Sequence, residues 1–445
     1  MAVTRGALAQ AVVLCGGLGT RLRDALGDVP KALVPIAGRP LLQHLLLSLG
    51  RAGTREVLLL AGHRGERVAA AARELAPEGL RVETLVETAP LGTAGALHAV
   101  AGRLAPRFLV LFGDVYAELD WRRFAAHAGA RGGLGTLLLH RTDHPEDCDT
   151  VALDDAHRVV GWSRRGALPA GAGGAALGNA ALAALHRDVL DYVPRERPSD
   201  LYGQVLPALV DGGAALHGYT SSEYVRDVGT PARLAEVDAD VRSGRARLRA
   251  ELALLDRDGV LAVERDGRPV LRPTELRLLP RAARAVRTLN AAGIRTALVT
   301  NQAAVARGLM SHADLEAVHA RLAALLAAEG ARLDLVLFCP HHPETHHAEG
   351  VPALRGPCAC RKPRTGMVER ALAELGARPW RAVVVGDATV DLALARRAGL
   401  ASIAVATGKG AADRAFRARP VWRSADVDAA ARWLAGQDEA ADADP

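Results

Sequence analysis

The sequence is poor in several residue types, and each scarcity excludes a class of protein. Aromatic residues make up 3% of the 445 residues, so the cores must be built from alanine, leucine and valine. No basic run is interleaved with aromatic residues, which argues against a nucleic-acid partner despite a net charge of +6. Small anionic substrates explain the surplus positive charge equally well.

Cysteines and long apolar runs are also scarce. The five cysteines, two of them in Cys-Ala-Cys, do not form the pattern of a disulfide framework. No apolar stretch reaches the roughly 18 residues that span a bilayer, and the first residues lack the layout of a signal peptide. We therefore expect a cytoplasmic protein with no membrane partner, and the sequence leaves a homo-oligomer open.

Lysine is the rarest charged residue, because 53 of the 56 basic residues are arginine. Lysine is a compact point charge that can lie against a phosphoryl group without the planar fork of a guanidinium. Lys31 and Lys362 fall inside motifs typical of phosphate binding, and Lys409 lies in a glycine-flanked loop near one. We predict that Lys31 and Lys362 bind phosphate, whereas the sequence does not decide for Lys409.

Short runs of valine, leucine and alanine alternate with longer amphipathic stretches, which is typical of βα units around mainly parallel sheets. Predicted strands with Gly, Asp or Asn within two residues of their end are Ala11–Leu14, Val57–Ala61, Phe108–Phe112, Leu252–Leu255, Thr296–Thr300, Ala382–Val385 and Ser402–Ala406. We predict an α/β protein of two tandem Rossmann-like domains, residues 1–235 and 251–436. Residues 236–250 are expected to form a helical connection, and residues 437–445 a disordered acidic tail.

A glycine-rich loop follows the first predicted strand. Glycine has no side chain, so the backbone N–H groups at Gly16, Gly17 and Gly19 can approach a polyphosphate closely. Arg21 can contact the terminal phosphates, and the chain continues through Pro-Lys31 to Gly-Arg-Pro40. The extended pattern resembles the sugar-nucleotidyltransferase family, whose signature is Gly-Gly-x-Gly-Thr-Arg-Leu followed by Pro-Lys and Gly-Lys/Arg-Pro.

The resemblance implies a reaction in which a sugar 1-phosphate oxygen attacks the α-phosphorus of a nucleoside triphosphate and pyrophosphate leaves. Lys31 would lie on phosphate oxygens near the reacting centre. Two carboxylates would hold Mg²⁺, and loop and strand residues would contact nucleobase and sugar. These residues are Asp114 and Asp227 for Mg²⁺, and Glu87, Gly92 and Asn179 for the substrates.

One stretch departs from this family. A Glu-Lys pair usually follows the middle strand, and its lysine helps to hold the sugar phosphate. Here the corresponding residues are Val160-Gly-Trp-Ser-Arg-Arg165. Arg164 or Arg165 can substitute for the lysine, so the residue that holds the sugar phosphate stays open.

The second domain begins with two carboxylates that follow a predicted buried strand. Asp256 can attack phosphorus, and Asp258 can protonate the leaving alcohol and then activate water. Such a pair alone could equally be a calcium loop or a turn. Later elements supply Thr300, Lys362 for the phosphoryl oxygens, and Asp387 for Mg²⁺ with Asp391 in support. Over residues 250–410 this order resembles the haloacid dehalogenase superfamily, in which Asp256, Asp258 and Asp387 would be the Mg²⁺ residues.

A cluster of cysteine and histidine predicts a zinc site in this domain. Cys-x-His and Cys-x-Cys offer a closed tetrahedral site of four ligands, Cys339, His341, Cys358 and Cys360, which is typical of structural zinc. We do not expect His342 to be a ligand, and we interpret His346 and His347 as solvated. Cys15 and Cys148 are interpreted as unrelated thiols. The zinc loop is expected to help close the active site.

The motif set resembles the heptose 1,7-bisphosphate 7-phosphatases and the histidinol-phosphate phosphatases, and it implies that Asn301, Arg307 and Arg361 bind substrate. Fusion favours the heptose reaction, because a phosphatase that leaves a sugar 1-phosphate supplies a transferase that consumes one. The resemblance implies guanylyl transfer, which the residues alone do not establish. Two alternatives stay open: a transferase for another sugar with a histidinol-phosphate-type phosphatase, or a silent transferase domain that senses sugar nucleotides.

Overall fold

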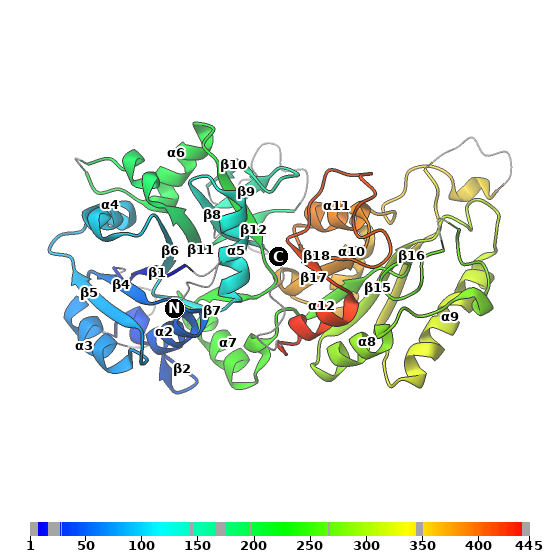
Figure 1. Ribbon diagram of the computed structural model, residues 1–445, viewed down its shortest axis with the longest axis horizontal. Coiled ribbons are helices and arrows are strands. Elements are labelled where there is room, and N and C mark those ends of the chain that lie inside the picture. Colours follow the sequence, from blue (N-terminus) through cyan, green and yellow to red (C-terminus); the bar gives the residue numbers. More distant parts are fainter. Residues whose placement is uncertain are drawn as a thin grey trace.

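A computed structural model describes residues 8–16, 27, 29–142, 146, 148–164, 175–195, 197–265, 268–343 and 350–437. Two α/β halves lie side by side along the long axis, the first in blue to green and the second in yellow-green to red (Figure 1). The predicted α/β class with mainly parallel sheets is confirmed. Among the described helices, none is both long and apolar enough to cross a membrane.

The first half is built on a large sheet that contains nine strands of the described chain. Its parallel part consists of β1 (Gln10–Leu14), β4 (Glu56–Ala61), β5 (Arg81–Val86) and β6 (Arg107–Phe112). β1 and most of β4 and β6 are buried runs of valine, leucine and alanine, as strands covered on both faces require. Covering helices are α2 (Leu41–Ala52), α3 (Gly65–Leu75), α4 (Gly92–Ala99), α5 (Trp121–Arg131) and α6 (Leu206–Asp211).

The other part of this sheet is mixed, which differs from a wholly parallel arrangement. β11 (Leu177–His186) runs antiparallel to β6 and to β8 (Gly135–Arg141). The remaining strands are β9 (Thr150–Leu153), β10 (Val159–Ser163) and β12 (Leu216–Thr220). The short connection between β9 and β10 allows antiparallel pairing, whereas a parallel crossover needs a dozen or more residues.

Two small antiparallel pairs accompany the large sheet. One is β2 (Pro35–Ile36) with β3 (Arg39–Pro40). The other, which we call the ribbon, is β7 (Val115–Glu118) paired with β13 (Tyr224–Asp227). Asp114 directly precedes β7 and Asp227 ends β13, so the ribbon carries both predicted metal carboxylates of this half at one end.

The second half contains a parallel sheet of six described strands in the order β16-β15-β14-β17-β18-β19. These are β14 (Leu252–Leu255), β15 (Arg295–Asn301), β16 (Leu335–Cys339), β17 (Ala382–Gly386), β18 (Ala401–Val405) and β19 (Trp422–Ser424). The helices are α8 (Ala282–Ala291), α9 (His312–Ala328), α10 (Gly366–Leu375), α11 (Thr389–Arg397) and α12 (Val427–Leu434). The strand order reverses at β14, so its carboxyl end is the expected ligand position.

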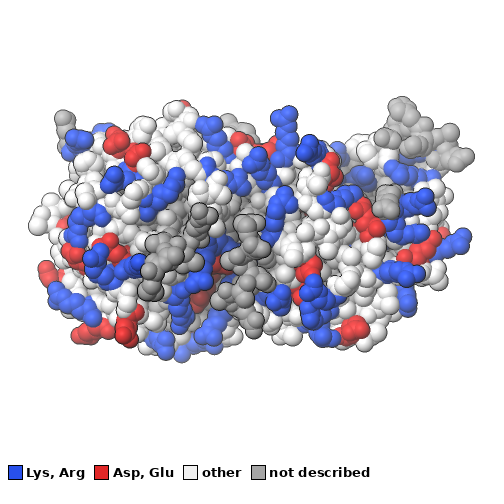
Figure 2. Space-filling model, viewed as in Figure 1, with Lys and Arg blue, Asp and Glu red and all other residues white. Residues whose placement is uncertain are grey.

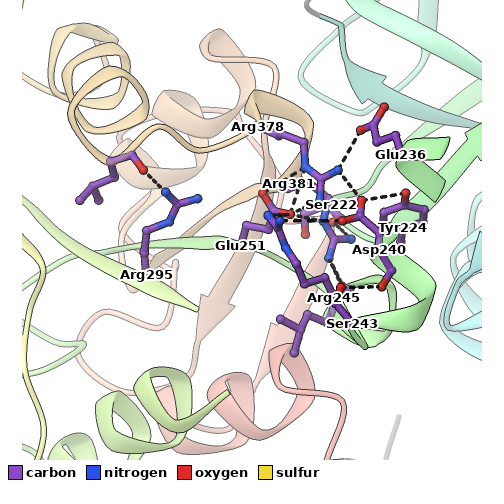
Figure 3. A network of polar contacts seen from close by, with 12 residues as sticks. Ser222, Tyr224, Glu236, Asp240, Ser243, Arg245, Glu251, Arg295, Arg378 and Arg381 are labelled. Atoms are coloured by element: carbon purple, nitrogen blue, oxygen red, sulfur yellow. Dashed lines mark hydrogen bonds and ion pairs between the residues drawn. The ribbon is translucent and has the colours of Figure 1, made fainter. Parts of the chain in front are cut away.

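Between the halves, α7 (Pro231–Arg242) is followed by a 3-10 turn, Arg245–Arg247. The helix ends before Gly244, whose left-handed φ of 79° cannot continue it. A dense network of polar contacts joins the halves here: Arg378 donates to Glu236, Asp240 and Glu251, and Arg381 donates to the carbonyl of Ser222 (Figure 3).

Charged side chains are scattered on the face drawn in Figure 2. Arginine and lysine occur over both halves, with aspartate and glutamate between them. Further contacts between the halves use such residues: Arg141 pairs with Glu369, and Arg396 donates to the carbonyl of Leu153. The two halves therefore pack directly against each other at several places.

Candidate active sites

In the second half, a buried lysine lies between two carboxylates at the carboxyl end of the sheet. Lys362 Nζ is 3.0 Å from Asp256 Oδ1 and 2.6 Å from Asp391 Oδ1. The lysine side chain is only 1% exposed. Burial alone would lower the pKa of Lys362, but the two carboxylates outweigh it and raise the pKa above its usual range. The ammonium therefore stays charged beside the predicted nucleophile.

Three carboxylates converge around this lysine. Asp256, Asp387 and Asp391 each offer an oxygen within 4.8 Å of the others. Burial is the main reason that the pKa of Asp387 rises to about 7 and that of Asp391 to about 6. Such a closely spaced set of buried carboxylates fits a divalent cation with oxygen ligands, such as Mg²⁺.

Asp258 lies apart from that group and has partners of its own. Its Oδ2 accepts from Arg257 Nη2 at 2.9 Å and from Gln302 Nε2 at 3.0 Å. Gln302 also lies 2.9 Å from the Thr300 hydroxyl. The structure thus brings Asp258 next to Thr300, which suits the predicted acid and base role. In the metal group it is the side chain of Asp391, not that of Asp258, that lies beside Asp256 and Asp387.

Two residues that hold Asp258 have no role that the sequence motifs predict. Arg257 is fully buried, and its position between two aspartates resembles a spacer rather than a functional site. Gln302 was visible only as the last residue of Thr-Asn-Gln. The signal that could have indicated Arg257 is a charged side chain in an otherwise buried stretch, because a buried charge needs a partner.

Asn301 is placed on the backbone of Lys362. Its Nδ2 donates to the Lys362 carbonyl at 3.2 Å, and its Oδ1 accepts from the Lys362 N–H at 2.9 Å. Both ends of the amide are therefore used to fix the lysine segment. Asn301 reaches the phosphate site through Lys362 in this arrangement, although it also borders the cavity described next.

These residues form the floor of a cavity of about 830 Å³. Basic side chains dominate its lining, eight against four carboxylates: Arg265, Arg268, Arg307, Arg361, Lys362, Arg364, Arg397 and Lys409 against Asp256, Asp258, Glu264 and Asp387. Arg265 and Lys409 are paired with Glu275 and Glu264. Such a cavity favours a substrate with more than one negative group.

The four predicted zinc residues converge next to this cavity. Cys339 Sγ lies 3.6 Å from Cys358 Sγ and 3.6 Å from His341 Nδ1, and Cys360 Sγ lies 3.3 Å from His341 Nδ1. Ligands at the corners of a zinc tetrahedron are about 3.3–3.8 Å apart when Zn–S is about 2.3 Å and Zn–N about 2.0 Å. The donor set and its spacing therefore fit zinc.

The zinc loop also shapes the cavity. Pro343, Gly356 and Cys358 belong to its lining, together with Arg361 just beyond the Cys-Ala-Cys turn. Arg361 donates to the His341 carbonyl at 2.9 Å. His342 lies outside the four-residue group, and its Nε2 is 3.1 Å from Arg307 Nη2. His346 and His347 lie outside the described residues.

In the first half, Lys31 and Asp114 form the core of the candidate site. Lys31 Nζ donates to Asp114 Oδ2 at 2.7 Å, and both side chains are about a quarter exposed. Gly113 is required here, because a Cβ would lie 2.6 Å from Cys15 Sγ. Burial is the main reason that the pKa of the Cys15 thiol rises to about 12, so it is a packing residue.

Asp227 lies at the same end of the ribbon. It pairs in register with Val115, and the next residue, Val228, donates its N–H to the Asp114 carbonyl at 2.8 Å. Arg233 Nη1 contacts both Asp227 oxygens at 3.0 and 2.9 Å. Two adjacent carboxylates held by Lys31 and Arg233 fit a cation bound between protein and phosphates. The sequence did not indicate Arg233.

Of the glycine-loop residues, Gly16 follows β1, whereas Gly17, Gly19 and Arg21 lie outside the described residues. Gly92 starts α4 with φ 73°, and a Cβ there would collide with the Ser199 backbone. Burial is the main reason that the pKa of Glu87 rises. Gly16 and Glu87 lie just beyond the carboxyl ends of β1 and β5, two strands of the same parallel sheet.

On the sugar side, Asn179 lies on β11, and its Oδ1 accepts from the Ala181 N–H at 3.0 Å. Arg164 donates to the Gly203 carbonyl at 2.7 Å. Arg165, the other candidate for the missing lysine, lies outside the described residues. The structure therefore leaves Arg164 as the described candidate, engaged by the backbone of residue 203.

Comparisons with known proteins match the two halves separately. Residues 10–244 match the nucleotidyl transferase family model, and residues 359–430 match the HAD-hydrolase-like family model. A mannose-1-phosphate guanylyltransferase of Mycobacterium tuberculosis is 34% identical over 236 residues, which are 53% of this chain. The chain covers 65% of that relative and 61% of a mannose-1-phosphate guanyltransferase of Saccharomyces cerevisiae, so it spans less than two thirds of these relatives.

The second half has its own relatives. A D-glycero-beta-D-manno-heptose-1,7-bisphosphate 7-phosphatase of Rhodopseudomonas palustris is 39% identical over 152 residues, covering 34% of this chain and 81% of the relative. Among solved structures, HddC of Yersinia pseudotuberculosis matches 53% of this chain and 100% of its own at 23% identity and a TM-score of 0.46. A D,D-heptose 1,7-bisphosphate phosphatase of B. bronchiseptica matches 42% of this chain and 99% of its own, at 32% identity and a TM-score of 0.38.

Proposed function

Because the chain belongs to the nucleotidyl transferase family through residues 10–244 and to the HAD-like phosphatases through its second half, we propose that it catalyses two consecutive steps on one sugar. The first step removes the 7-phosphate of D-glycero-D-manno-heptose 1,7-bisphosphate. The second transfers GMP from GTP to the heptose 1-phosphate and releases pyrophosphate. The observation that carries the proposal is the strongly basic cavity above Asp256 and Lys362.

In the phosphatase step, an Asp256 carboxylate oxygen attacks phosphorus, and the bond from phosphorus to the sugar oxygen breaks. Asp258, aligned by Arg257 and Gln302, gives its proton to the leaving alcohol. It then takes a proton from the water that attacks the aspartyl phosphate; the bond from phosphorus to Asp256 breaks, and orthophosphate and the free carboxylate result. Lys362 lies on the phosphoryl oxygens. Mg²⁺ held by Asp256, Asp387 and Asp391 supplies further neutralisation of these oxygens when bound.

The cavity distinguishes the two phosphatase substrates that the motifs leave open. Histidinol phosphate carries an ammonium group, which the excess of arginine and lysine around the cavity would repel. A bisphosphate presents a second anion to the same side chains. Arg268 is one of these lining side chains, and we assign it to the phosphate that is not cleaved. The cavity therefore supports the bisphosphate.

In the transferase step, Lys31 holds phosphate oxygens, and the ribbon carboxylates Asp114 and Asp227 face the same position. Mg²⁺ held there supplies charge neutralisation on the triphosphate when bound. The guanylyltransferase relative supports GTP as donor. The presence of Lys31 together with both carboxylates, Asp114 and Asp227, argues against a silent sensor.

Zn²⁺ bound by Cys339, His341, Cys358 and Cys360 is proposed as a structural ion. The four ligands leave no open position for substrate, and the loop they fix ends at Arg361 and Lys362. Its role is to hold these two cations toward the cavity.

A substrate panel tests the proposed function. The wild-type chain is incubated with heptose 1,7-bisphosphate, histidinol phosphate and other sugar bisphosphates, and orthophosphate is measured. Heptose 1-phosphate, mannose 1-phosphate and glucose 1-phosphate are then supplied with each nucleoside triphosphate, and pyrophosphate is measured. The proposal expects the heptose compounds and GTP to give the highest kcat/KM. Histidinol phosphate as the best phosphatase substrate, or no pyrophosphate with any pair, would contradict it.

A further inference from the structure

The ribbon that carries the transferase carboxylates is packed against the phosphatase half. Tyr224, at the start of β13, is completely buried, and so nearly is Tyr116 on β7. Their rings meet edge to face at 5.9 Å. The next ring in this stack is Trp380, 5.5 Å from Tyr224, and it belongs to the turn before β17 of the other half.

Trp380 completes a small apolar cluster that otherwise belongs to the transferase half and the connection. The cluster contains both ribbon tyrosines, Val228 beside Asp227, and Ile36 and Leu41 from the segment that follows Lys31. Trp380 is 3% exposed within it. The ring contacts run from His44 of α2 through Tyr116 and Tyr224 to Trp380, so a phosphatase residue packs against the ribbon, which in turn packs against the segment that follows Lys31.

Three arginine side chains lie close to the ring of this tryptophan. The guanidinium groups of Arg378 and Arg381 lie 5.0 and 5.5 Å from the Trp380 ring centre, and that of Arg226 on β13 lies 5.3 Å from it. Asp240 accepts from the Tyr224 hydroxyl at 2.9 Å and from Arg378 at 2.6 Å (Figure 3). The ribbon, the connection and the turn are therefore tied into one unit.

The same turn is remote from the phosphatase site. Trp380 and Arg381 precede β17, and Asp387 follows its other end. A strand of this length spans roughly 16 Å at about 3.3 Å per residue. Glu251, which pairs with Arg378, likewise precedes β14, whereas Asp256 follows it. A change at Trp380 should therefore affect the ribbon before it affects the phosphatase carboxylates.

We propose that Trp380, a residue of the phosphatase half, is a positioning residue for the transferase reaction. Its ring holds the ribbon so that Asp114 and Asp227 face Lys31. The inference rests on the proposed transfer reaction, because it assigns a role toward that site. It adds that the first half depends on a side chain from the second.

The test compares three full-length variants. Trp380→Ala removes the ring, Trp380→Phe retains an aromatic ring, and Arg396→Ala removes a contact between the halves that does not touch the ribbon. Transferase kcat and KM, phosphatase kcat/KM, and amide hydrogen exchange of residues 115–118 and 224–228 are measured for each. If Trp380→Ala does not fold, Trp380→Leu replaces it.

We expect Trp380→Ala to lower transferase kcat at least about tenfold, with KM changed less than about threefold, because misplaced groups act mainly on the chemical step. Amide hydrogen exchange in both ribbon segments should become faster. Phosphatase kcat/KM should stay within about twofold of the wild-type value. Trp380→Phe should restore most of kcat.

The proposal is overturned by a Trp380→Ala variant with near wild-type transferase kcat and ribbon exchange. It is equally overturned if both reactions fall together, or if Arg396→Ala has the same effect. A wild-type chain without transferase activity on any sugar phosphate would contradict the proposed function instead. The exchange measurement would still decide whether Trp380 holds the ribbon.

Discussion

The two candidate sites hold their lysines in different surroundings. Lys362 has a side chain that is 1% exposed and lies between two carboxylates, whereas the side chain of Lys31 is 24% exposed and lies beside one. The carboxylates of the phosphatase site come from strand ends of one parallel sheet. Those of the transferase site come from a ribbon that packs on the other half of the chain.

This difference indicates how far each site is formed without substrate. The phosphatase cations and carboxylates already neutralise one another in a buried place, so the site is preorganised for a phosphoryl group. The transferase site is more open, and the triphosphate itself completes its charge balance. Changes to single groups should therefore cost most in the phosphatase.

The largest expected effect is the loss of the nucleophile. Asp256→Asn should lower phosphatase kcat by several orders of magnitude, because no covalent intermediate can form. Nucleotidyl transfer from purified heptose 1-phosphate should stay within about twofold. Orthophosphate and pyrophosphate release are measured on the same preparation. If both reactions disappear in a folded protein, the two sites are not separate.

The next effect concerns exchange of lysine for arginine. Lys362→Arg and Lys31→Arg should each lower kcat/KM of their own reaction on the order of 100-fold, because a planar guanidinium displaces phosphate by about 1 Å. The loss of kcat/KM should be at least as large for the buried Lys362 as for Lys31.

Lys409→Arg is the matched control. Its side chain is 48% exposed and pairs with Glu264 at 2.9 Å, while its contact to Asp387 comes from the backbone N–H. This exchange should therefore be mild. More than about half of wild-type activity in both Lys31→Arg and Lys362→Arg would refute a special need for lysine.

Zinc removal should have a smaller effect, confined to the phosphatase. We expect one Zn²⁺ per chain after purification without added metal, and its loss in Cys358→Ser. Phosphatase kcat/KM should then fall roughly tenfold as Arg361 and Lys362 lose their fixed positions. Cys148→Ser, outside the cluster, serves as control. Less than half an equivalent of zinc in the wild type would contradict the site.

The basic cavity predicts a substrate-dependent effect of Arg268. Arg268→Ala should raise KM for the bisphosphate several-fold, on the order of one charged hydrogen bond. It should leave the KM for a simple monophosphate ester nearly unchanged. Equal increases for both substrates would show that Arg268 does not meet the second phosphate.

The smallest effect is a pH dependence of stability at the junction. Glu223 is fully buried, and this burial is the main reason that its pKa rises to about 7. The charge of Arg249 opposes the rise, and the charge of Asp120 adds to it. A carboxyl group with a raised pKa in the folded state binds its proton more tightly there than in the unfolded chain. Its contribution to stability is therefore present at low pH and is lost as pH rises from about 4.5 to about 7.

Glu223→Gln should remove this contribution to the pH dependence, because the amide carries no charge at either pH. Relative to wild type, the variant should gain a few degrees in Tm between pH 5 and about 8. Thermal unfolding of both proteins across this range is the measurement. A constant difference in Tm would show that Glu223 does not titrate in the folded protein.

The sequence predicts strands best where a short apolar run leads directly into a recognisable motif. All seven predicted strands overlap observed ones, because each is a short apolar run with Gly, Asp or Asn within two residues of its end. In the mixed region, β10 is followed by Arg164 and lacks this pattern, whereas β9 stops at Asp154 and was nevertheless not predicted. Antiparallel pairing of β11 depends on contacts far apart in sequence, so local patterns could not indicate it.

Contacts across the chain explain what the sequence could not predict in the sites. Asp391 was expected only in support, yet it lies with Asp256 and Asp387, because α11 starts just after β17, the strand that pairs with β14. No motif indicates the residues that hold the carboxylates, because their contacts form only in the folded chain. These residues are Arg257 and Gln302, which hold Asp258, and Arg233, which holds Asp227. Trp380 was one of five tryptophans with no motif around it, and its role depends entirely on how the two halves pack.

One experiment tests most directly that the chain performs both steps in order. Wild-type protein is mixed with heptose 1,7-bisphosphate, GTP and Mg²⁺, and the reaction is followed by phosphorus NMR. The account predicts that orthophosphate appears first and that pyrophosphate follows in equal final amount. Asp256→Asn should release neither from the bisphosphate, and should release pyrophosphate alone when heptose 1-phosphate is added. Pyrophosphate formed from the bisphosphate without prior release of orthophosphate would contradict the account.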